Sequence, residues 1–181
     1  MGTSSCLNVI EIKPQDSQAN IPSPVILHRA KTNKEASEIK ILKSTILVLH
    51  NNLRKKHNAQ ELIEDIELSE IADEHAKNLL VFKGKIMNIY KDKIYGENVV
   101  ISENKDIKEI FKKWENEGNN YDYDKSKYTK DTSHFTQIIW KETKEIGIGF
   151  SQDEKNKKYS FVFLYYPPGN TLGEFSNNVT K

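Results

Sequence analysis

The sequence predicts an α+β fold, with the helices first along the chain and the strands last. Apolar residues in the earlier part of the chain recur every three to four positions, which is the period of an amphipathic helix. Near residue 145 the pattern changes to short stretches that are rich in β-branched and aromatic residues, as strands are. Helices followed by strands are typical of α+β layering and not of repeating βαβ units.

The helical period predicts three helices, which span about residues 33–57, 69–82 and 104–118. In the first, Ile39, Leu42 and Ile46 begin an apolar stripe that one face of a helix would bury. Ser69 is the expected N-cap of the second helix, because its hydroxyl can accept a hydrogen bond from the first turn. Gly118 stands where the third helix would end.

Two strands are predicted, at about residues 145–151 and 159–166. The polar turn QDEKNKK joins them, and PPGN at residues 167–170 ends the second. Gly147 and Gly149 have no β-carbon, so we expect them to let another element pack closely on the first strand.

At 181 residues the chain is long enough for one domain with its own core. We expect a flexible arm at residues 1–33, a domain at 34–176 and a short tail at 177–181. The charged residues balance to a net charge of +1, which argues against a nucleic-acid-binding protein. Cys6 is the single cysteine, so no disulfide can form within the chain.

Four segments carry a resemblance to a known family, namely HNNLR (50–54), YGENV (95–99), HFTQIIWKETKEIGIG (134–149) and YYPPGN (165–170). Their order and spacing resemble the CAP superfamily, the cysteine-rich secretory, antigen 5 and pathogenesis-related 1 proteins, over about residues 35–175. With one cysteine, the chain is similar to the intracellular branch, typified by the Golgi-associated plant pathogenesis-related protein. The resemblance implies a three-layer α-β-α sandwich with a small antiparallel sheet.

The same resemblance implies a central cleft that holds two histidines and two glutamates. Glu97 of GEN, Glu117 of WENE and His134 of HFTQ match three of these positions. The fourth falls near Met87, where no histidine stands. His75 lies on the second predicted helix among core-facing positions, and we do not expect it to replace the missing residue. HFTQ should face the cleft, and the IIW that follows it should lie in the core.

Two interpretations of this cluster remain open. His134, Glu97 and Glu117 could hold a divalent metal such as Zn²⁺, although one imidazole in place of two halves the nitrogen ligands that zinc favours. Alternatively, His134 bridges both carboxylates by hydrogen bonds as a structural polar cluster. Ser133 adjoins His134 in sequence, which does not suit a catalytic Ser–His pair, and we expect that the protein is not an enzyme.

Residues 119–134, NNYDYDKSKYTKDTSH, are polar and contain Tyr121, Tyr123 and Tyr128. Their spacing resembles the loop that precedes HFTQ in the sterol-binding fungal CAP proteins, which implies a lipid site lined by these tyrosines. Aromatic faces can pack on a flat apolar ring system while their hydroxyls stay in water. The alternative is a loop that packs on the rim of the cleft.

The N-terminal residues MGTSSC predict attachment to a membrane. Removal of Met1 would expose Gly2 for myristoylation, and Cys6 could take palmitate as a second anchor. No signal peptide and no run of roughly 20 apolar residues is visible. We therefore expect an intracellular, cytoplasmic protein that can reside at the Golgi or another membrane.

Together, these observations predict a non-enzymatic protein that binds a sterol, a fatty acid or another lipid, and that does not bind nucleic acid. The alternative is a protein-interaction module that uses the open cleft, as a homodimer. A metal-dependent or hydrolytic activity is a third interpretation.

Overall fold

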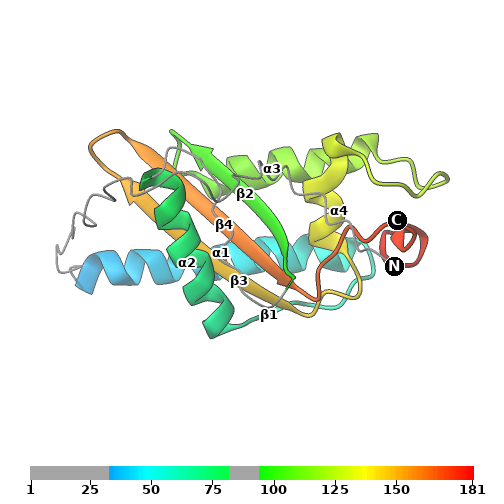
Figure 1. Ribbon diagram of the computed structural model, residues 1–181, viewed down its shortest axis with the longest axis horizontal. Helices are drawn as coiled ribbons and strands as arrows, with labels where there is room; N and C mark the ends of the chain where they lie inside the picture. The colour runs from blue at the N-terminus through cyan, green and yellow to red at the C-terminus, as the bar shows by residue number, and fades with distance from the viewer. Residues whose placement is uncertain (1–32, 82–93) are drawn as a thin grey trace, which may run out of the picture.

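The computed structural model describes residues 33–81 and 94–181. Within them, four strands form one sheet in the order β1-β3-β4-β2, and helices cover both of its faces (Figure 1). The strands are β1 (Ile63–Glu64), β2 (Gly96–Ser102), β3 (Glu145–Asp153) and β4 (Lys158–Tyr166). The helices are α1 (Asn33–Lys56), α2 (Ile66–Val81), α3 (Ile107–Glu117), α4 (Ser133–Ile139) and α5 (Phe175–Asn178), with single 3₁₀ turns at Gly118–Asn120 and Lys130–Thr132. Residues 1–32 of the predicted arm, with Gly2 and Cys6, and the segment around Met87 lie outside the described residues.

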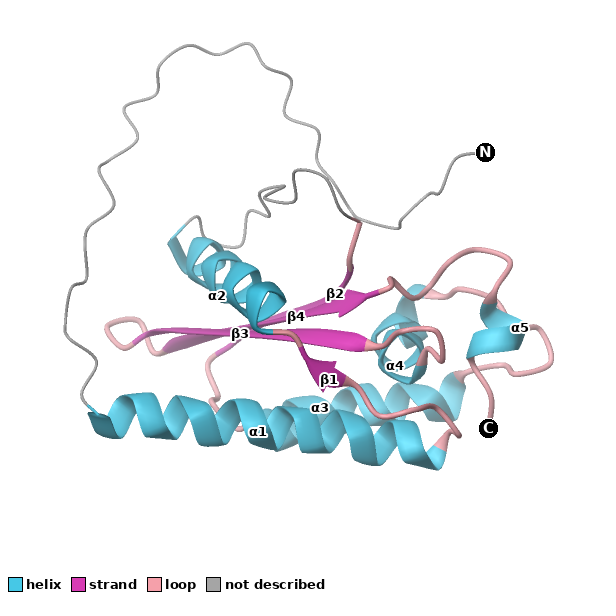
Figure 2. Cartoon of the chain, turned by 90° about the horizontal axis from the view of Figure 1, so that it is seen from below, coloured by secondary structure: helices cyan, strands magenta, loops and turns pink. Residues whose placement is uncertain are grey.

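The elements form three layers, as the resemblance implies. Helix α2 lies on one face of the sheet, while α1 and α3 lie on the other (Figure 2). The larger core, between the sheet and α1, α3 and α4, includes Ile46, Phe111 and Phe163. The smaller core, between the sheet and α2, includes Ala72 and Val162. The predicted α-β-α sandwich is therefore confirmed.

The sheet is mixed because of its shortest strand. Strand β4 is antiparallel to both β2 and β3, as expected for a small antiparallel sheet. Strand β1 instead runs parallel to β3, with Ile63 opposite Glu145 and Glu64 opposite Ile146. It follows α1 and leads directly into α2, so its direction is set by the crossover to the other face of the sheet.

Helix α2 packs closely on β3 at two glycines. A β-carbon at Gly147 would overlap the carbonyl oxygen of Leu68, and one at Gly149 would overlap the carbonyl oxygen of Ala72. In both places the atom in the way belongs to the backbone of α2, so it cannot rotate aside. The prediction that these glycines permit close packing is confirmed.

The prediction that Ser69 is the N-cap of α2 is wrong. Asp65 precedes the helix, and its Oδ1 accepts a hydrogen bond from the backbone N–H of Leu68 at 2.7 Å. Ser69 lies one turn further on and is buried, with its Oγ accepting from the backbone N–H of Ile148 at 3.0 Å. A carboxylate earlier in the chain therefore takes the capping role, and the serine joins α2 to the edge of β3.

Residues 177–181, predicted as a tail, pack against the domain. Asn178 and Val179 are 1% and 2% exposed. His57 Nδ1, at the end of α1, donates a hydrogen bond to the backbone carbonyl of Thr180 at 3.0 Å. The last residues of the chain therefore continue the fold next to α1.

Candidate functional site

His134 and Glu117 form a hydrogen-bonded pair where α3 and α4 meet. His134 Nδ1 lies 2.8 Å from Glu117 Oε1, and Nδ1 is the donor because a carboxylate only accepts. The other carboxylate oxygen accepts from the backbone N–H groups of His134 and Phe135, each at 3.1 Å. Glu117 therefore satisfies two donors in the first turn of α4 and also orients the imidazole.

Trp114 supports the other side of His134. Its indole lies one turn before Glu117 on α3 and stacks on the imidazole, with the ring centroids 5.0 Å apart and the planes 9° apart. The side chain of His134 is 35% exposed, whereas that of Glu117 is 18% exposed. With Nδ1 engaged, Nε2 is the nitrogen through which His134 can accept a hydrogen bond or a proton from a bound molecule.

Glu97 pairs with a second histidine, His75. His75 Nδ1 on α2 lies 2.8 Å from Glu97 Oε1 on β2, and the two side chains are 0% and 6% exposed. Whether His75 replaces the missing family histidine stays a prediction, but it provides an imidazole beside Glu97. The available signal was its position on the inward face of α2, between Ala72 and Leu79, where a buried histidine requires a partner.

Glu97, Glu117 and His134 do not form the single cluster that was predicted, because neighbouring side chains on a strand point to opposite faces. Glu97 is opposite Leu164, which belongs to the core under α2. The next residue, Asn98, faces the other way and donates a hydrogen bond to the backbone carbonyl of His134 at 3.2 Å. Within residues 33–81 and 94–181, the structure therefore has two histidine–glutamate pairs in place of one bridged set.

The described residues do not fit a zinc ion. Across residues 33–81 and 94–181, no three His, Cys, Asp or Glu side chains form a group that could hold a metal. A protein zinc site takes three or four such ligands. His134, Glu97 and Glu117 are therefore not assembled as the ligands of one metal ion.

A buried series of hydrogen bonds links α1 to the backbone of His134. His50 on α1 is fully buried, and its Nδ1 donates to the backbone carbonyl of Ile46 at 2.8 Å. Its Nε2 accepts from the hydroxyl of Tyr165 at 2.9 Å, and this hydroxyl accepts in turn from Asn98 Nδ2 at 3.2 Å. The same amide nitrogen reaches the carbonyl of His134, so the series runs from α1 to α4.

Neutral His50 should make the stability of the protein fall in acid. Burial lowers the pKa of His50 from 6.5 to about 4, although its hydrogen bond to Ile46 offsets part of this effect. The unfolded chain binds this proton below about pH 6.5, whereas the folded protein binds it only near pH 4. Stability of about 3 kcal/mol should therefore be lost as the pH falls between these values. Urea unfolding at a series of pH values should show that the free energy of unfolding falls less steeply with acid in His50→Gln than in the unchanged protein. An equal pH dependence in the two proteins would contradict the assignment of this loss to His50.

HFTQ does not face outward as a unit. His134 is partly exposed, but Phe135, Thr136 and Gln137 are as buried as the IIW that follows them. Thr136 Oγ1 donates to Asn170 Oδ1 at 2.6 Å, and Gln137 Oε1 accepts from the backbone N–H of Gly169 at 3.0 Å. The PPGN turn, which was expected only to end the second strand, therefore also holds α4 in place.

The predicted lipid-binding tyrosines pack on the domain. Tyr121 is 6% exposed, and its ring lies edge-on to Tyr123 at 4.9 Å. Tyr128 lies edge-on to Phe175 at 6.4 Å, and Lys181 Nζ lies 5.5 Å from the ring of Tyr123. Burial raises the pKa values of Tyr121 and Tyr123. The described conformation thus places the tyrosine rings against protein side chains, and a sterol would have to displace some of these contacts.

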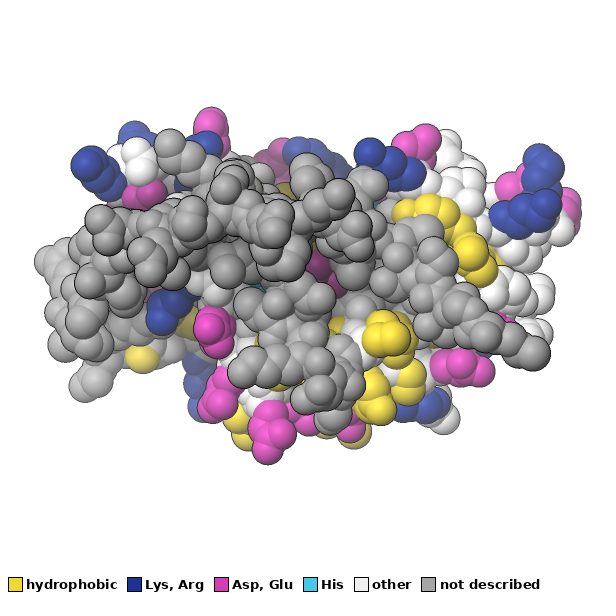
Figure 3. Space-filling model, viewed as in Figure 1, with side chains coloured by type: hydrophobic (Ala, Val, Ile, Leu, Met, Phe, Trp, Pro, Cys, Tyr) yellow, Lys and Arg dark blue, Asp and Glu magenta, His cyan; other side chains and the backbone are white. Residues whose placement is uncertain are grey.

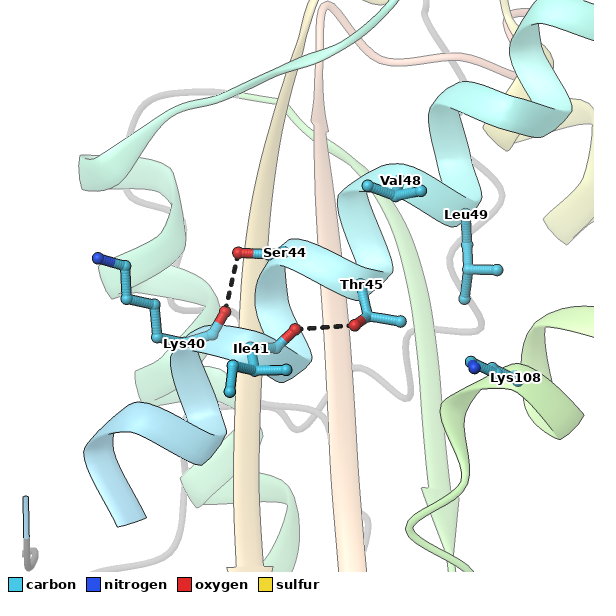
Figure 4. A pocket seen from close by; sticks show the side chains of 7 residues that line it. All are labelled: Lys40, Ile41, Ser44, Thr45, Val48, Leu49 and Lys108. Atoms are coloured by element: carbon cyan, nitrogen blue, oxygen red, sulfur yellow. Dashed lines mark hydrogen bonds between the residues drawn. The ribbon is translucent and has the colours of Figure 1, made fainter. Parts of the chain in front are cut away.

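A groove of about 490 Å³ runs along α1 and reaches the start of α3 (Figure 4). Its lining residues are Lys40, Ile41, Ser44, Thr45, Val48, Leu49 and Lys108. Ser44 Oγ and Thr45 Oγ1 donate to backbone carbonyls four residues earlier, at 3.0 and 2.8 Å, so these hydroxyls are satisfied within the helix. The sequence signal that was missed is Ile41 and Val48, which are apolar but stand off the buried stripe and are 65% and 56% exposed.

A layered α-β-α domain with a histidine–glutamate pair between α3 and α4 defines a structural class and not an activity. The model of the cysteine-rich secretory protein family, CAP, matches residues 47–166 of the chain. The protein therefore belongs to the CAP family.

The relatives and solved structures agree with this assignment. The human Golgi-associated plant pathogenesis-related protein 1 is 29% identical over 140 residues, which cover 74% of this chain and 89% of the relative. Venom allergen 5 of Polistes fuscatus is 33% identical over 123 residues, covering 62% of this chain and 59% of the relative. The structure of venom allergen-like protein 4 of Schistosoma mansoni has a TM-score of 0.55 and 23% identity, and covers 69% of this chain and 87% of that chain. The last similarity shows a shared fold.

Among the described helices, none has the length and apolar character required to cross a lipid bilayer.

Proposed function

We propose that this CAP protein binds a lipid without catalysing a reaction, and that an acyl chain lies in the groove along α1. The groove carries this proposal. Its volume of about 490 Å³ falls within the range of small-molecule sites. Ile41, Val48 and Leu49 provide apolar contact, while the hydroxyls of Ser44 and Thr45 are satisfied and do not oppose an apolar occupant.

The charges beside the groove favour a lipid with an anionic head. Lys40 lies at one end of the groove, and Lys108 approaches from α3 opposite Leu49 (Figure 4). An ammonium group at either end can pair with a carboxylate or phosphate while the chain lies between them. A fatty acid combines these features, which makes it the simplest ligand of this class.

The tyrosines of residues 121–128 are the proposed site for a sterol. Their rings are large and apolar, and Tyr123 and Tyr128 are only partly buried. Because they contact Lys181 and Phe175, sterol binding would require a local rearrangement of this loop. The groove needs no such change, so we expect fatty acid to bind more readily than sterol.

Membrane attachment remains part of the proposal. Similarity to a Golgi-associated relative supports residence at a membrane, and the N-terminal MGTSSC provides Gly2 and Cys6 for acylation. A lipid-binding domain held at a membrane would meet its ligand at high local concentration. The alternative is a protein-interaction module that uses the open cleft, as a homodimer, and such a module does not require the groove.

The decisive measurement is equilibrium binding of labelled palmitate and cholesterol to the purified protein. We expect saturable palmitate binding that Val48→Asp weakens by about tenfold or more, because the acyl chain would cover an unpaired carboxylate. Val81→Asp is the matched control, since Val81 is 69% exposed at the end of another helix, α2. Its palmitate affinity should equal that of the unchanged protein.

The double variant Tyr123→Ala, Tyr128→Ala separates the two lipid sites. We expect it to reduce cholesterol binding and to preserve palmitate binding. Equal palmitate binding by Val48→Asp and the unchanged protein would exclude the groove. Absence of saturable binding of both lipids would refute lipid binding as the function.

A further inference from the structure

One end of the sheet is left uncovered by α2. Close packing of α2 begins at Gly147 of β3, where the backbone of Leu68 touches the strand. Two residues earlier on the same face lies Glu145, which is opposite Ile63 of β1 on one side and Tyr166 of β4 on the other. The row Ile63–Glu145–Tyr166 therefore lies beyond the start of α2, and spans about 10 Å across three strands.

Large apolar side chains remain exposed along this row. Ile63 is 73% exposed, Tyr166 is 39% exposed, and Ile66 in the first turn of α2 is 75% exposed. Figure 3 shows this face, with hydrophobic side chains next to acidic ones along its lower edge. Single exposed apolar residues are common on proteins, but three large ones gathered at one end of a sheet favour a binding surface.

Carboxylates surround and interrupt this apolar group. Glu145 stands between Ile63 and Tyr166 in the row, and Glu67 and Glu70 are exposed on the adjoining part of α2. Residues 57–76 contain no lysine or arginine. Lys144, which precedes Glu145 in the sequence, has its Nζ 3.3 Å from Gln60 Oε1. A molecule that covers the isoleucines must therefore neutralise carboxylates.

We propose that Ile63, Ile66, Glu145 and Tyr166, with Glu67 and Glu70 beside them, form a docking surface for a basic, amphipathic segment of a partner protein. Apolar side chains of the partner cover the two isoleucines and Tyr166. A lysine or arginine pairs with Glu145 in the middle of the row, where exclusion of water strengthens the charge interaction.

The charge argues against a membrane as the occupant. An anionic lipid surface would be repelled by Glu67, Glu70 and Glu145, whereas a basic peptide is attracted by all three. The surface is also distinct from the groove along α1, which lies on the opposite side of the sheet and is bordered by lysines. Partner docking and lipid binding can therefore be tested separately.

The probe is a short synthetic amphipathic peptide of leucine and lysine, compared with its counterpart in which glutamate replaces every lysine. We expect saturable binding of the lysine peptide alone, measured by calorimetry. Ile63→Ser together with Ile66→Ser should weaken it by about tenfold or more. Val81→Ser, at the far end of α2, is the matched control and should change nothing. All three side chains are exposed, so the variants should unfold at the same urea concentration.

A charge reversal gives the sharper result. Glu145→Lys should weaken binding of the lysine peptide and strengthen that of the glutamate peptide. Unchanged affinity in the isoleucine double variant or in Glu145→Lys would overturn the proposal, as would failure of the lysine peptide to bind. Binding of phosphatidylcholine–phosphatidylserine vesicles that depends on Ile63 and Ile66 would also overturn it, by assigning the surface to a membrane.

Discussion

Replacing Arg54 with methionine should lower the free energy of unfolding by about 3–5 kcal/mol. The Arg54 side chain is fully buried, and its guanidinium donates to four backbone carbonyls at 2.6 to 2.9 Å. These carbonyls belong to Gln60, Ile138, Trp140 and Thr143. Burial lowers its pKa to about 10, so it remains charged at neutral pH. Methionine would fill much of the volume but leave these carbonyls without their donor. Urea unfolding followed by tryptophan fluorescence measures the loss.

Two further variants separate the hydrogen bonds from the charge. Arg54→Lys keeps the charge but cannot place donors in the planar arrangement of a guanidinium. Its free energy of unfolding should therefore lie between those of Arg54→Met and the unchanged protein. Lys55→Met, at an exposed neighbouring position on α1, should change stability by less than about 0.5 kcal/mol. A loss below about 1 kcal/mol in Arg54→Met would show that the four carbonyls find other donors, and would contradict the prediction.

Gly149→Ala should destabilise the protein by about 3 kcal/mol, although it adds a single methyl group. That methyl would overlap the carbonyl oxygen of Ala72 and press on the backbone nitrogen of Asp73. Relief requires α2 to move away from β3 and to loosen the core that includes Val162. Thermal unfolding should show the loss, while Ser151→Ala on the same strand should stay close to the unchanged protein. Equal stability of Gly149→Ala and Ser151→Ala would mean that α2 moves away from β3 without loss of unfolding free energy, and would contradict the prediction.

Periodicity in the sequence predicted the long elements well. The helix α1 and the strands β3 and β4 follow the predicted ranges, because each buries one face or both faces over many residues. Strand β2 was recognised only as a motif, since Gly96 has no side chain and Glu97 and Asn98 are polar although both are mostly buried. Helix α4 has only seven residues, which is too short for a helical period to emerge.

The candidate site was predicted in part. The pairing of His134 with Glu117 agrees with the motif positions. The partner of Glu97 could not be predicted, because it depends on which face of β2 the carboxylate occupies, and this follows from the register with β4. His75 therefore looked like an ordinary core residue. The docking row Ile63–Glu145–Tyr166 was equally hidden, since its members come from three strands that only the folded sheet brings together.

The attachment of α4 has a consequence for the order of folding. This helix is held by Glu117 from α3, by Asn98 from β2 and by Asn170 from the turn after β4. These anchors are far apart in sequence, and each must close a chain loop before it contributes. We therefore infer that the surroundings of His134 form late, after the sheet and α3 have assembled. A partly folded or truncated chain that retains helix and sheet would lack an ordered His134, so the environment of this imidazole reports on completion of the whole domain.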